Sequence, residues 1–451
     1  MTKQNKYIFV CQSCGHQAPK WMGRCPECGQ WNSFIEEISE PRDRDGVSSN
    51  VGRPQAIDNI SIDSEYRLKT GIMEFDRTLG GGLIPGSIIL LGGEPGIGKS
   101  TLILQVAGGI SGQGLKSLYI SGEESLQQIK LRARRLSIDS ENLLVVTGNC
   151  IEDLFEQIRE LNPDLLVVDS IQTIYTNMLP STPGSVGQLR EVSARFLRFA
   201  KETNTPVFLV GHVTKDGVIA GPKLLEHLVD TVLYFEGDSS HVFRIVRAVK
   251  NRYGSTNEIG VFEMEEEGLK EVMNPSRIFL EERQERAAGS VVIPCLEGTR
   301  PILVEIQALV GASPFGVPRR TAIGVDHNRV SLLVAVLGKR MGIEMGDQDI
   351  FVNVAGGLKV DEPAADLGIV SAMISSFLDK PVSPDMVVFG EIGLAGEVRG
   401  VSQPELRIKE AKKLGFNRCL LSNSNKENCV SVPNIKMVGI ESVRGLMDVL
   451  F

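Results

Sequence analysis

The chain has no uninterrupted apolar run of about 18 residues, the length that a membrane-spanning helix needs. No apolar core follows its first residues, so we expect no secretory signal and a cytoplasmic location. It also lacks an excess of positive charge: the formal net charge is −8. Any contact with nucleic acid must therefore come from a local basic lining, because the body as a whole is not basic. At 451 residues the chain is too long for one ordinary core, and two to four domains are expected.

Cysteine is scarce outside one cluster. Four of the eight cysteines show no metal-ligand spacing and are interpreted as buried or unreactive thiols: Cys150, Cys295, Cys419 and Cys429. The other four form two C-x2-C pairs with ten residues between them: Cys11, Cys14, Cys25 and Cys28. Four thiolates at this spacing predict a closed, structural Zn²⁺ site, and a cytoplasmic chain disfavours the alternative of disulfides.

We therefore expect a zinc ribbon over residues 1–35, whose folding depends on the metal. Its basic residues, together with Trp21 and Trp31, allow a nucleic-acid surface. They equally allow an ordinary solvated face or a grip on a protein partner, and the sequence leaves these readings open. Residues 36–65 are rich in Glu, Asp, Ser, Arg and Pro, which is typical of a mobile linker.

A nucleotide-binding loop stands at the start of the next segment. The apolar run from Ser87 to Leu91 indicates a buried parallel strand, and 102–107 reads as a buried helix. The loop between them fits G-x-x-x-x-G-K-[ST], whose backbone N–H groups converge on a triphosphate. Lys99 is expected on the β- and γ-phosphates of ATP, and Ser100 on Mg²⁺. The predicted nucleotide-binding residues are Gly93, Glu94, Pro95, Gly96, Ile97, Gly98, Lys99, Ser100 and Thr101.

Further apolar runs alternate with helical stretches, which indicates a parallel sheet with crossover helices. Chemistry is then expected at the carboxyl ends of the strands. Asp169 closes the run 165–168 and is expected to position Mg²⁺ through water. Glu123 and Glu124 follow the run 118–120, and one of them is expected to orient the attacking water, with Glu123 slightly favoured. The alternative is that both are solvated turn acids.

Two loops after later strands carry candidate contacts to a nucleic-acid backbone. The loop 179–187 runs into Arg190, and Lys215 and Lys223 lie in a glycine-containing segment after the run 207–210. His212, in the same segment, is either a satisfied buried histidine or a sensor of the γ-phosphate.

The motifs follow one another in an order that resembles a known family. After the ribbon and the phosphate loop come YISGEES (119–125), VVDSIQT (167–173), GHVTKDG (211–217) and KNRYG (250–254). The chain is similar in these segments to the bacterial RadA (Sms) family of RecA-like DNA-repair ATPases. The resemblance implies a hexameric ring around DNA, with Lys250 and Arg252 near the nucleotide of the neighbouring subunit. Tyr253 replaces a phenylalanine of the family motif, a mild departure.

The last segment shows a second alternation of strands and helices and resembles the peptidase domain of Lon. Where the resemblance places the nucleophile the chain has Ala364, and the counterpart of the catalytic lysine falls at or near Arg407. Alanine has no nucleophilic atom and a guanidinium is no neutral base, so proteolysis is not expected. Arg319 and Arg320 are further candidate phosphate contacts, although such a doublet can equally be a solvated face.

The expected architecture is α/β. It comprises a zinc ribbon (1–35), a linker (36–65), a RecA-like P-loop ATPase domain (66–272) and an α+β Lon-protease-like domain without peptidase activity (273–451). The resemblance implies a DNA-dependent ATPase and helicase in recombination and repair, which translocates on single-stranded DNA and promotes branch migration. Implied partners are single-stranded and branched DNA and a RecA-type recombinase, and the cofactors are ATP, Mg²⁺ and Zn²⁺. A KaiC-like regulatory ATPase without translocation and an ATP-dependent protease are the alternatives.

Overall fold

A computed structural model describes residues 6–11, 16–27, 29–39, 56, 67–212, 224–237, 243–256, 258–281, 283–284, 286–313, 316, 318–430 and 432–451. The chain divides into two compact units, residues 1–271 and 272–451. Among the described residues no helix has the length and apolar character that crossing a membrane requires.

The main sheet of the first unit has the strand order β12-β11-β10-β9-β4-β8-β7-β5-β6. Its strands are β4 (Ile88–Gly93), β5 (Ser117–Ser121), β6 (Leu143–Thr147), β7 (Leu165–Asp169), β8 (Val207–His212), β9 (Thr231–Glu236), β10 (Phe243–Asn251), β11 (Ile259–Glu265) and β12 (Gly268–Glu271). The run from β9 to β6 is parallel, as the sequence predicts. β10, β11 and β12 extend it as antiparallel strands, which the sequence analysis did not predict.

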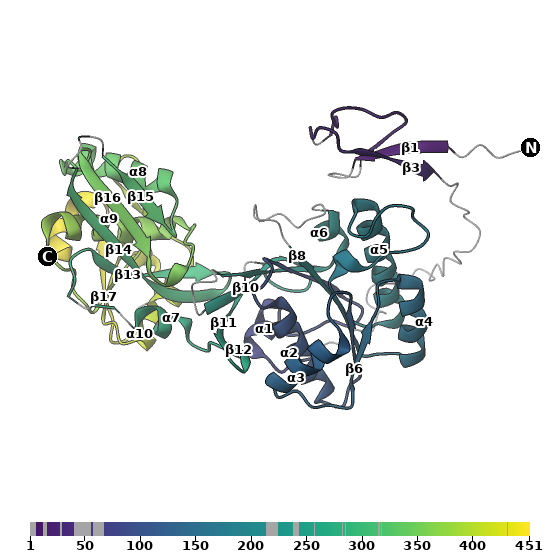
Figure 1. Ribbon diagram of the computed structural model, residues 1–451. Coiled ribbons are helices and arrows are strands. Elements are labelled where there is room, and N and C mark those ends of the chain that lie inside the picture. The colour runs from purple at the N-terminus through teal and green to yellow at the C-terminus, as the bar shows by residue number, and fades with distance from the viewer. Residues whose placement is uncertain are drawn as a thin grey trace, which may run out of the picture. The chain divides into compact units, whose positions relative to one another are not determined.

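Helices cover both faces of this sheet (Figure 1). One face carries α1 (Met73–Thr78), α2 (Lys99–Ser111) and α3 (Leu126–Arg135); the other carries α4 (Ile151–Leu161), α5 (Val186–Thr203) and α6 (Leu224–Leu228). Alternate side chains of β4 point to opposite faces of the sheet. Ile89 and Leu91 pack in the core on one face, and Ile88 and Leu90 pack in the core on the other. All are buried, so the strand reads as a continuous apolar run. At ~1.5–3 kcal/mol for each large side chain removed from water, this double burial stabilises the frame that carries the site.

The N-terminal ribbon is a small antiparallel sheet of β2 (Gln17–Ala18), β1 (Lys6–Cys11) and β3 (Phe34–Ser39). Its described core consists of Cys11, Ala18, Cys25 and Phe34. So few apolar side chains cannot stabilise a fold of this size, which agrees with a metal-dependent ribbon.

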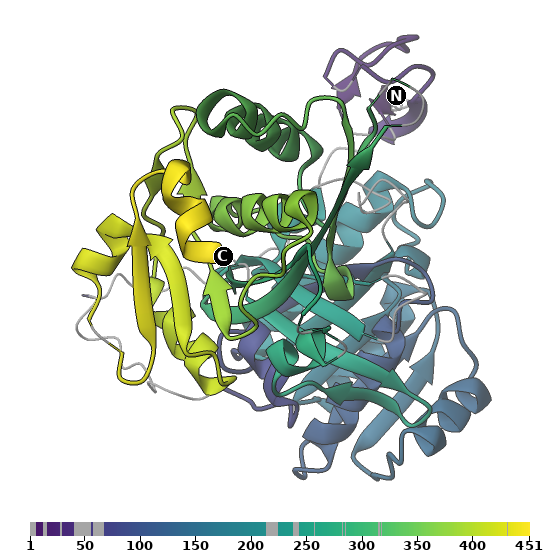
Figure 2. The same ribbon diagram turned by 90° about the vertical axis from the view of Figure 1, so that its left-hand side faces the viewer.

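The second unit has a seven-stranded sheet within its described residues, in the order β15-β16-β14-β13-β17-β20-β21 (Figure 2). The strands are β13 (Ser290–Glu297), β14 (Arg300–Ala312), β15 (Arg320–Ile323), β16 (Gln348–Val354), β17 (Met386–Val388), β20 (Arg418–Ser422) and β21 (Lys436–Ile440). Parallel and antiparallel pairs are mixed, which agrees with the α+β expectation.

Helices lie on both faces of the second sheet as well. α9 (Asp366–Leu378) contacts β13 and β14, and α8 (His327–Val336) contacts α9. On the face of Val292, α10 (Pro404–Lys413) packs through Ile408 and Ala411. α8 and α9 belong to the alternation of strands and helices that the sequence predicts for this segment. The remaining helices of this unit are α7 (Pro275–Leu280), α11 (Asn423–Asn428) and α12 (Leu446–Leu450).

Arg407, one of the two positions that the Lon resemblance assigns to the peptidase dyad, forms an ion pair with Glu362. Arg407 is fully buried on α10, and its two terminal nitrogens donate to the two carboxylate oxygens of Glu362 at 2.8 and 2.7 Å. It also donates to the carbonyl of Pro294 at 2.6 Å and stacks over the ring of Phe389. Ala364, two residues after Glu362, is buried. This guanidinium is fully engaged in holding β13, α10 and the segment before α9 together.

Removal of Arg407 is therefore expected to destabilise the second unit. Arg407→Ala leaves the Glu362 carboxylate without its cation, at a cost of about 3–5 kcal/mol. The control is Arg399→Ala, which breaks the exposed pair with Glu397 and should cost at most about 1 kcal/mol. Hydrogen exchange of peptides from β13 and β17 measures the difference. Equal protection in the two variants would contradict this assignment, whereas a Glu362→Leu/Arg407→Met double variant should recover protection.

Candidate nucleotide-binding and hydrolytic site

The carboxyl ends of four neighbouring parallel strands bring the predicted chemical groups into one row. The register pairs Gly93 of β4 with His212 of β8, and Ser121 of β5 with Asp169 of β7. Asp169 is in turn level with Val210 of β8. Groups separated by up to 119 positions in the chain therefore share one edge of the sheet, the edge where parallel α/β sheets bind ligands.

The phosphate loop connects β4 to α2. Gly98 precedes the helix with a φ of +118°, and a Cβ atom there would stand 2.8 Å from the Met264 methyl carbon, so the position requires glycine. All nine residues predicted to bind nucleotide, 93–101, lie in this loop and the first turn of α2, where unpaired helix N–H groups attract anions.

Lys99 lies folded back over the loop. Its side chain is buried, and its ammonium donates to the carbonyl oxygens of Gly93 and Glu94, each at 2.8 Å. Burial lowers the pKa of Lys99 to about 8, although the carboxylates of Asp169 and Glu123 oppose this shift. At neutral pH the group is therefore a desolvated cation, which suits the binding of a polyphosphate.

Asp169 ends β7 as a buried carboxylate, and the hydroxyl of Tyr119 donates to it at 2.5 Å. Burial, followed by the charge of Asp169 and this hydrogen bond, raises the pKa of the tyrosine, which stays a neutral donor. Tyr119 is a site residue that the sequence analysis missed. The sequence did offer a signal for it, because Tyr119 lies one residue before the end of a predicted strand.

The two glutamates after β5 have different partners. Glu123 accepts from the hydroxyl of Ser170, and the Nε2 atom of His212 lies 3.4 Å from its carboxylate. Glu124 forms an ion pair with Arg132 of α3, and its backbone N–H donates to Ser121. Glu123 is thus directed toward the row of strand ends and Glu124 toward the helix. The structure thus gives different partners to two glutamates that the sequence hardly distinguishes.

These residues fit a nucleotide with its metal ion. Residues 93–98 supply backbone donors, Lys99 a cation, and Ser100 and Asp169 the oxygen donors that Mg²⁺ prefers. A bound Mg²⁺ would neutralise charge on the β- and γ-phosphates.

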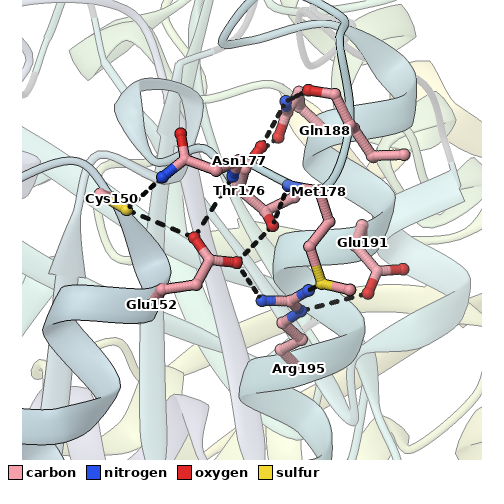
Figure 3. Close-up of polar contacts among 9 residues, drawn as sticks. Cys150, Glu152, Thr176, Asn177, Met178, Gln188, Glu191 and Arg195 are labelled. Carbon is pink, nitrogen blue, oxygen red and sulfur yellow. Dashed lines mark hydrogen bonds and ion pairs between the residues drawn. The ribbon is translucent and has the colours of Figure 1, made fainter.

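A polar network at the same edge fixes the loop that follows η2 (Ile171–Thr173) (Figure 3). Glu152, in the first turn of α4, accepts from the hydroxyl of Thr176 at 2.5 Å and from Arg195 of α5 at 2.6 Å. The amide of Gln188 donates to three carbonyls of the loop, those of Thr176, Leu179 and Ser181. The loop between β7 and α5 is thereby tied to α4 and to α5.

Glu152 is ionised in this network. Burial alone would raise its pKa, but the hydrogen bonds from Thr176, Arg195, Cys150 and the Asn177 backbone hold it at about 2. Sequence reasoning missed it, because the 24 positions between Glu152 and Thr176 leave no periodic signal. Cys150, predicted as idle, donates its thiol to this carboxylate at 3.3 Å.

The predicted intersubunit cations lie at the opposite edge of the same sheet. Lys250 is level with Val232, and thus with Leu90 of β4, and Arg252 pairs with the buried Asp230, which also accepts from the N–H of Ile88. Ile88 is five residues before Gly93, or roughly 16 Å along the strand. Neither cation can serve the phosphate loop of its own chain.

The segment 250–254 is a rigid element. The ammonium of Lys250 donates to the carbonyls of Glu226, His227 and Val229 at the end of α6, and burial followed by the charge of Arg252 lowers its pKa. Arg252 points outward, with half of its side chain exposed. The hydroxyl of Tyr253 lies 3.5 Å from Lys201, so the departure from the family motif gives one added polar contact.

Two of the four predicted zinc ligands lie in the described part of the ribbon. Cys11 and Cys25 are buried, and Cys25 begins a tight turn that closes on Gly29 at a φ of +73°. Buried thiols beside such a turn fit a thiolate-bound metal ion. Cys14 and Cys28 lie outside the described residues.

The candidate nucleic-acid contacts that the structure describes are divided between the two units. Arg190 is exposed on α5, beyond the loop that Glu152 fixes. Arg319 is exposed and Arg320 half-buried at the start of β15, in the second unit. Arg320 lines a cavity of about 330 Å³ with Lys339 and Glu344. Lys215 and Lys223 lie outside the described residues.

The pKa of Lys99 predicts how nucleotide affinity depends on pH. Below pH 8 the lysine is charged before binding, whereas above pH 8 it must first take up a proton. The affinity for an ATP analogue is therefore expected to be flat from pH 6 to about 7.5 and to fall above pH 8, toward tenfold per unit. Fluorescent-nucleotide titrations of the wild type and of Lys99→Ala test this. A flat profile up to pH 9.5 in the wild type would contradict it; the variant should bind weakly at every pH.

The ribbon, the nucleotide-binding domain and the C-terminal unit each contain a segment that matches a known protein family. Residues 66–218 match the model of an AAA domain, 9–36 that of a rubredoxin metal binding domain, and 335–450 that of the Lon protease (S16) C-terminal proteolytic domain. The chain is 54% identical over 446 residues to the DNA repair protein RadA of Bacillus subtilis, covering 98% of this chain and 97% of the relative. It is 51% identical to that of Halalkalibacterium halodurans over 99% of both chains, and 50% identical to that of Listeria monocytogenes over 96% of both. The chain belongs to the RadA family of DNA repair proteins.

Proposed function

We propose that the protein is a DNA-dependent ATPase and helicase of recombination and DNA repair in the cytoplasm, which translocates on single-stranded DNA and promotes branch migration. The observation that carries the proposal is the split of the catalytic groups between two opposite edges of one sheet. Lys99, Asp169 and Glu123 meet at the edge of the phosphate loop, while Arg252 stands at the far edge with an exposed guanidinium. A site completed by a second copy requires an oligomer, and a head-to-tail arrangement of identical copies forms a ring where the rotation between copies closes.

Within this proposal Glu123 orients the attacking water and is the general base. Its carboxylate is held by Ser170 and faces His212, and its charge acts on Lys99. We further propose that His212 senses the γ-phosphate, since its Nε2 atom lies 3.4 Å from the Glu123 carboxylate. Glu124 anchors α3 through Arg132 and takes no part in the chemistry.

The assignment of the base is tested by a matched pair of variants. Glu123→Gln keeps the size of the side chain but removes the base, so kcat for ATP hydrolysis should fall by about 10²–10⁴ with nucleotide binding retained. Glu124→Gln weakens a partly exposed ion pair and should leave kcat within about threefold of the wild type. A larger loss in Glu124→Gln than in Glu123→Gln would exchange the two roles.

The family name of the relatives supports a role in DNA repair, and the ring supports motion along DNA. In a ring, hydrolysis can pass from one interface to the next, and the loop fixed by Glu152 joins the carboxyl edge to α5, which carries Arg190. The proposed partners are single-stranded and branched DNA and a RecA-type recombinase, and the proposed ring is a hexamer.

The C-terminal unit is proposed to have no peptidase activity. Residues 335–450 match the Lon model, but Ala364 offers no nucleophile and Arg407 is engaged with Glu362. It is then a scaffold for assembly or for DNA contact. The ribbon is proposed to hold Zn²⁺ through Cys11, Cys14, Cys25 and Cys28.

Steady-state ATP hydrolysis with and without single-stranded DNA tests the DNA dependence. We expect stimulation by single-stranded DNA at low salt, where phosphate contacts are strongest, and its disappearance in Lys99→Ala. The same preparation should displace a strand from a forked duplex when ATP is present. Hydrolysis that is indifferent to DNA, with no strand displacement, would favour a regulatory ATPase of the KaiC type.

A further inference from the structure

Two tryptophans on the ribbon are exposed although the ribbon has little apolar surface of its own. Trp21 is 53% exposed and Trp31 is 70% exposed. The described core of the ribbon is made by Cys11, Ala18, Cys25 and Phe34 and includes neither ring. Rings that contribute nothing to this core leave a large apolar area in water, which marks an interaction surface.

The two rings lie on either side of Gly23. A Cβ atom at this glycine would stand 3.7 Å from the ring of Trp21 and 3.8 Å from the ring of Trp31. A backbone pair fixes this arrangement, because Trp31 bridges to Arg24 and the N–H of Asn32 donates to the carbonyl of Gly23 at 2.8 Å. Both rings therefore lie close to the backbone of Gly23 and so close to one another.

Cations border the rings. The guanidinium of Arg24 lies 5.8 Å from the centre of the Trp31 ring, and its Nε donates to the carbonyl of Gly29 at 3.0 Å. Lys20, next to Trp21, is exposed. Met22, next to Trp21 in the chain, packs toward the ribbon core. A protein-docking surface has an apolar centre, whereas flat rings with adjacent cations suit bases and phosphates.

We infer that Trp21 and Trp31 form a stacking platform for the bases of single-stranded DNA, with Lys20 and Arg24 on the phosphates. Base stacking on aromatic rings is tolerant of sequence because every base has a π-face. This surface lies outside the ATPase domain and gives the chain a second contact with the single-stranded DNA. The inference rests on the proposed DNA-dependent function, since it names a further contact to the same partner.

The sequence supplies an internal probe for the test. Trp21 and Trp31 are the two tryptophans of the entire chain, so the tryptophan emission of the intact protein reports this surface alone. Oligothymidylate is titrated into the full chain at low salt while the anisotropy of a labelled copy of the oligonucleotide measures total binding. We expect quenching of the emission that saturates with the anisotropy and weakens as salt is raised.

Single-tryptophan variants resolve the two rings. Trp21→Phe and Trp31→Phe keep an aromatic ring at each position, and the remaining tryptophan of each variant should still be quenched. Trp21→Ala/Trp31→Ala should weaken binding about tenfold or more. The control is Ile35→Ala, which removes another exposed apolar side chain of the ribbon and should leave the affinity unchanged. Bound zinc is measured in every variant to confirm that the ribbon is intact.

The outcomes separate the inference from the proposed function. Binding by anisotropy with unchanged tryptophan emission overturns the platform and leaves the DNA-dependent ATPase standing. Absence of any binding at low salt overturns both. Quenching that appears with a purified RecA-type recombinase but not with the oligonucleotide assigns the surface to a protein and also overturns the inference.

Discussion

The register of four parallel strands is the constraint on which the site depends. β4, β8, β7 and β5 are hydrogen-bonded so that Gly93, His212, Asp169 and Ser121 share one edge of the sheet. Gly93 is level with His212, and Asp169 and Ser121 are level with Val210, two residues earlier. A slip of one residue would turn Asp169 to the other face of the sheet and away from Lys99. The register is specified because both faces are buried, so each strand must present its apolar residues to two cores at once.

The same register separates the proposed catalytic groups. Strand ends on one edge gather phosphate-binding and acidic groups, whereas Lys250, near the end of β10, and Arg252, just after it, lie toward the other edge. The buried carboxylate of Asp230 forms ion pairs with Arg252 and with Lys201. It therefore fixes the position of the partly exposed Arg252 side chain. Under the proposed function, one chain carries two complementary half-sites at opposite edges of the sheet, and head-to-tail assembly forms a ring where the rotation between copies closes.

The sequence predicts the functional groups that belong to short motifs of contiguous residues. A phosphate loop between an apolar strand and a helix, a carboxylate that closes an apolar run, and cysteine pairs at ligand spacing each combine local pattern with specific chemistry. The sequence hardly distinguishes Glu123 from Glu124, because the partners that differ between them, Ser170, His212 and Arg132, come from other parts of the fold. The ion pair of Arg407 with Glu362 and the network of Glu152 likewise join residues 45 and 24 positions apart. The antiparallel direction of β11 and β12 also has no signature in composition.

The central claim is that each hydrolytic site is completed by the neighbouring copy. Mixing two variants tests it most directly: Glu123→Gln lacks the base at its own edge, and Arg252→Ala lacks the cation it presents to its neighbour. Each variant alone should hydrolyse ATP poorly. Random mixed rings made by co-refolding or subunit exchange should recover about a quarter of wild-type activity, because a head-to-tail interface then pairs an intact base with an intact arginine at some sites. No recovery in demonstrably mixed rings, or an Arg252→Ala protein with wild-type activity, would contradict the account.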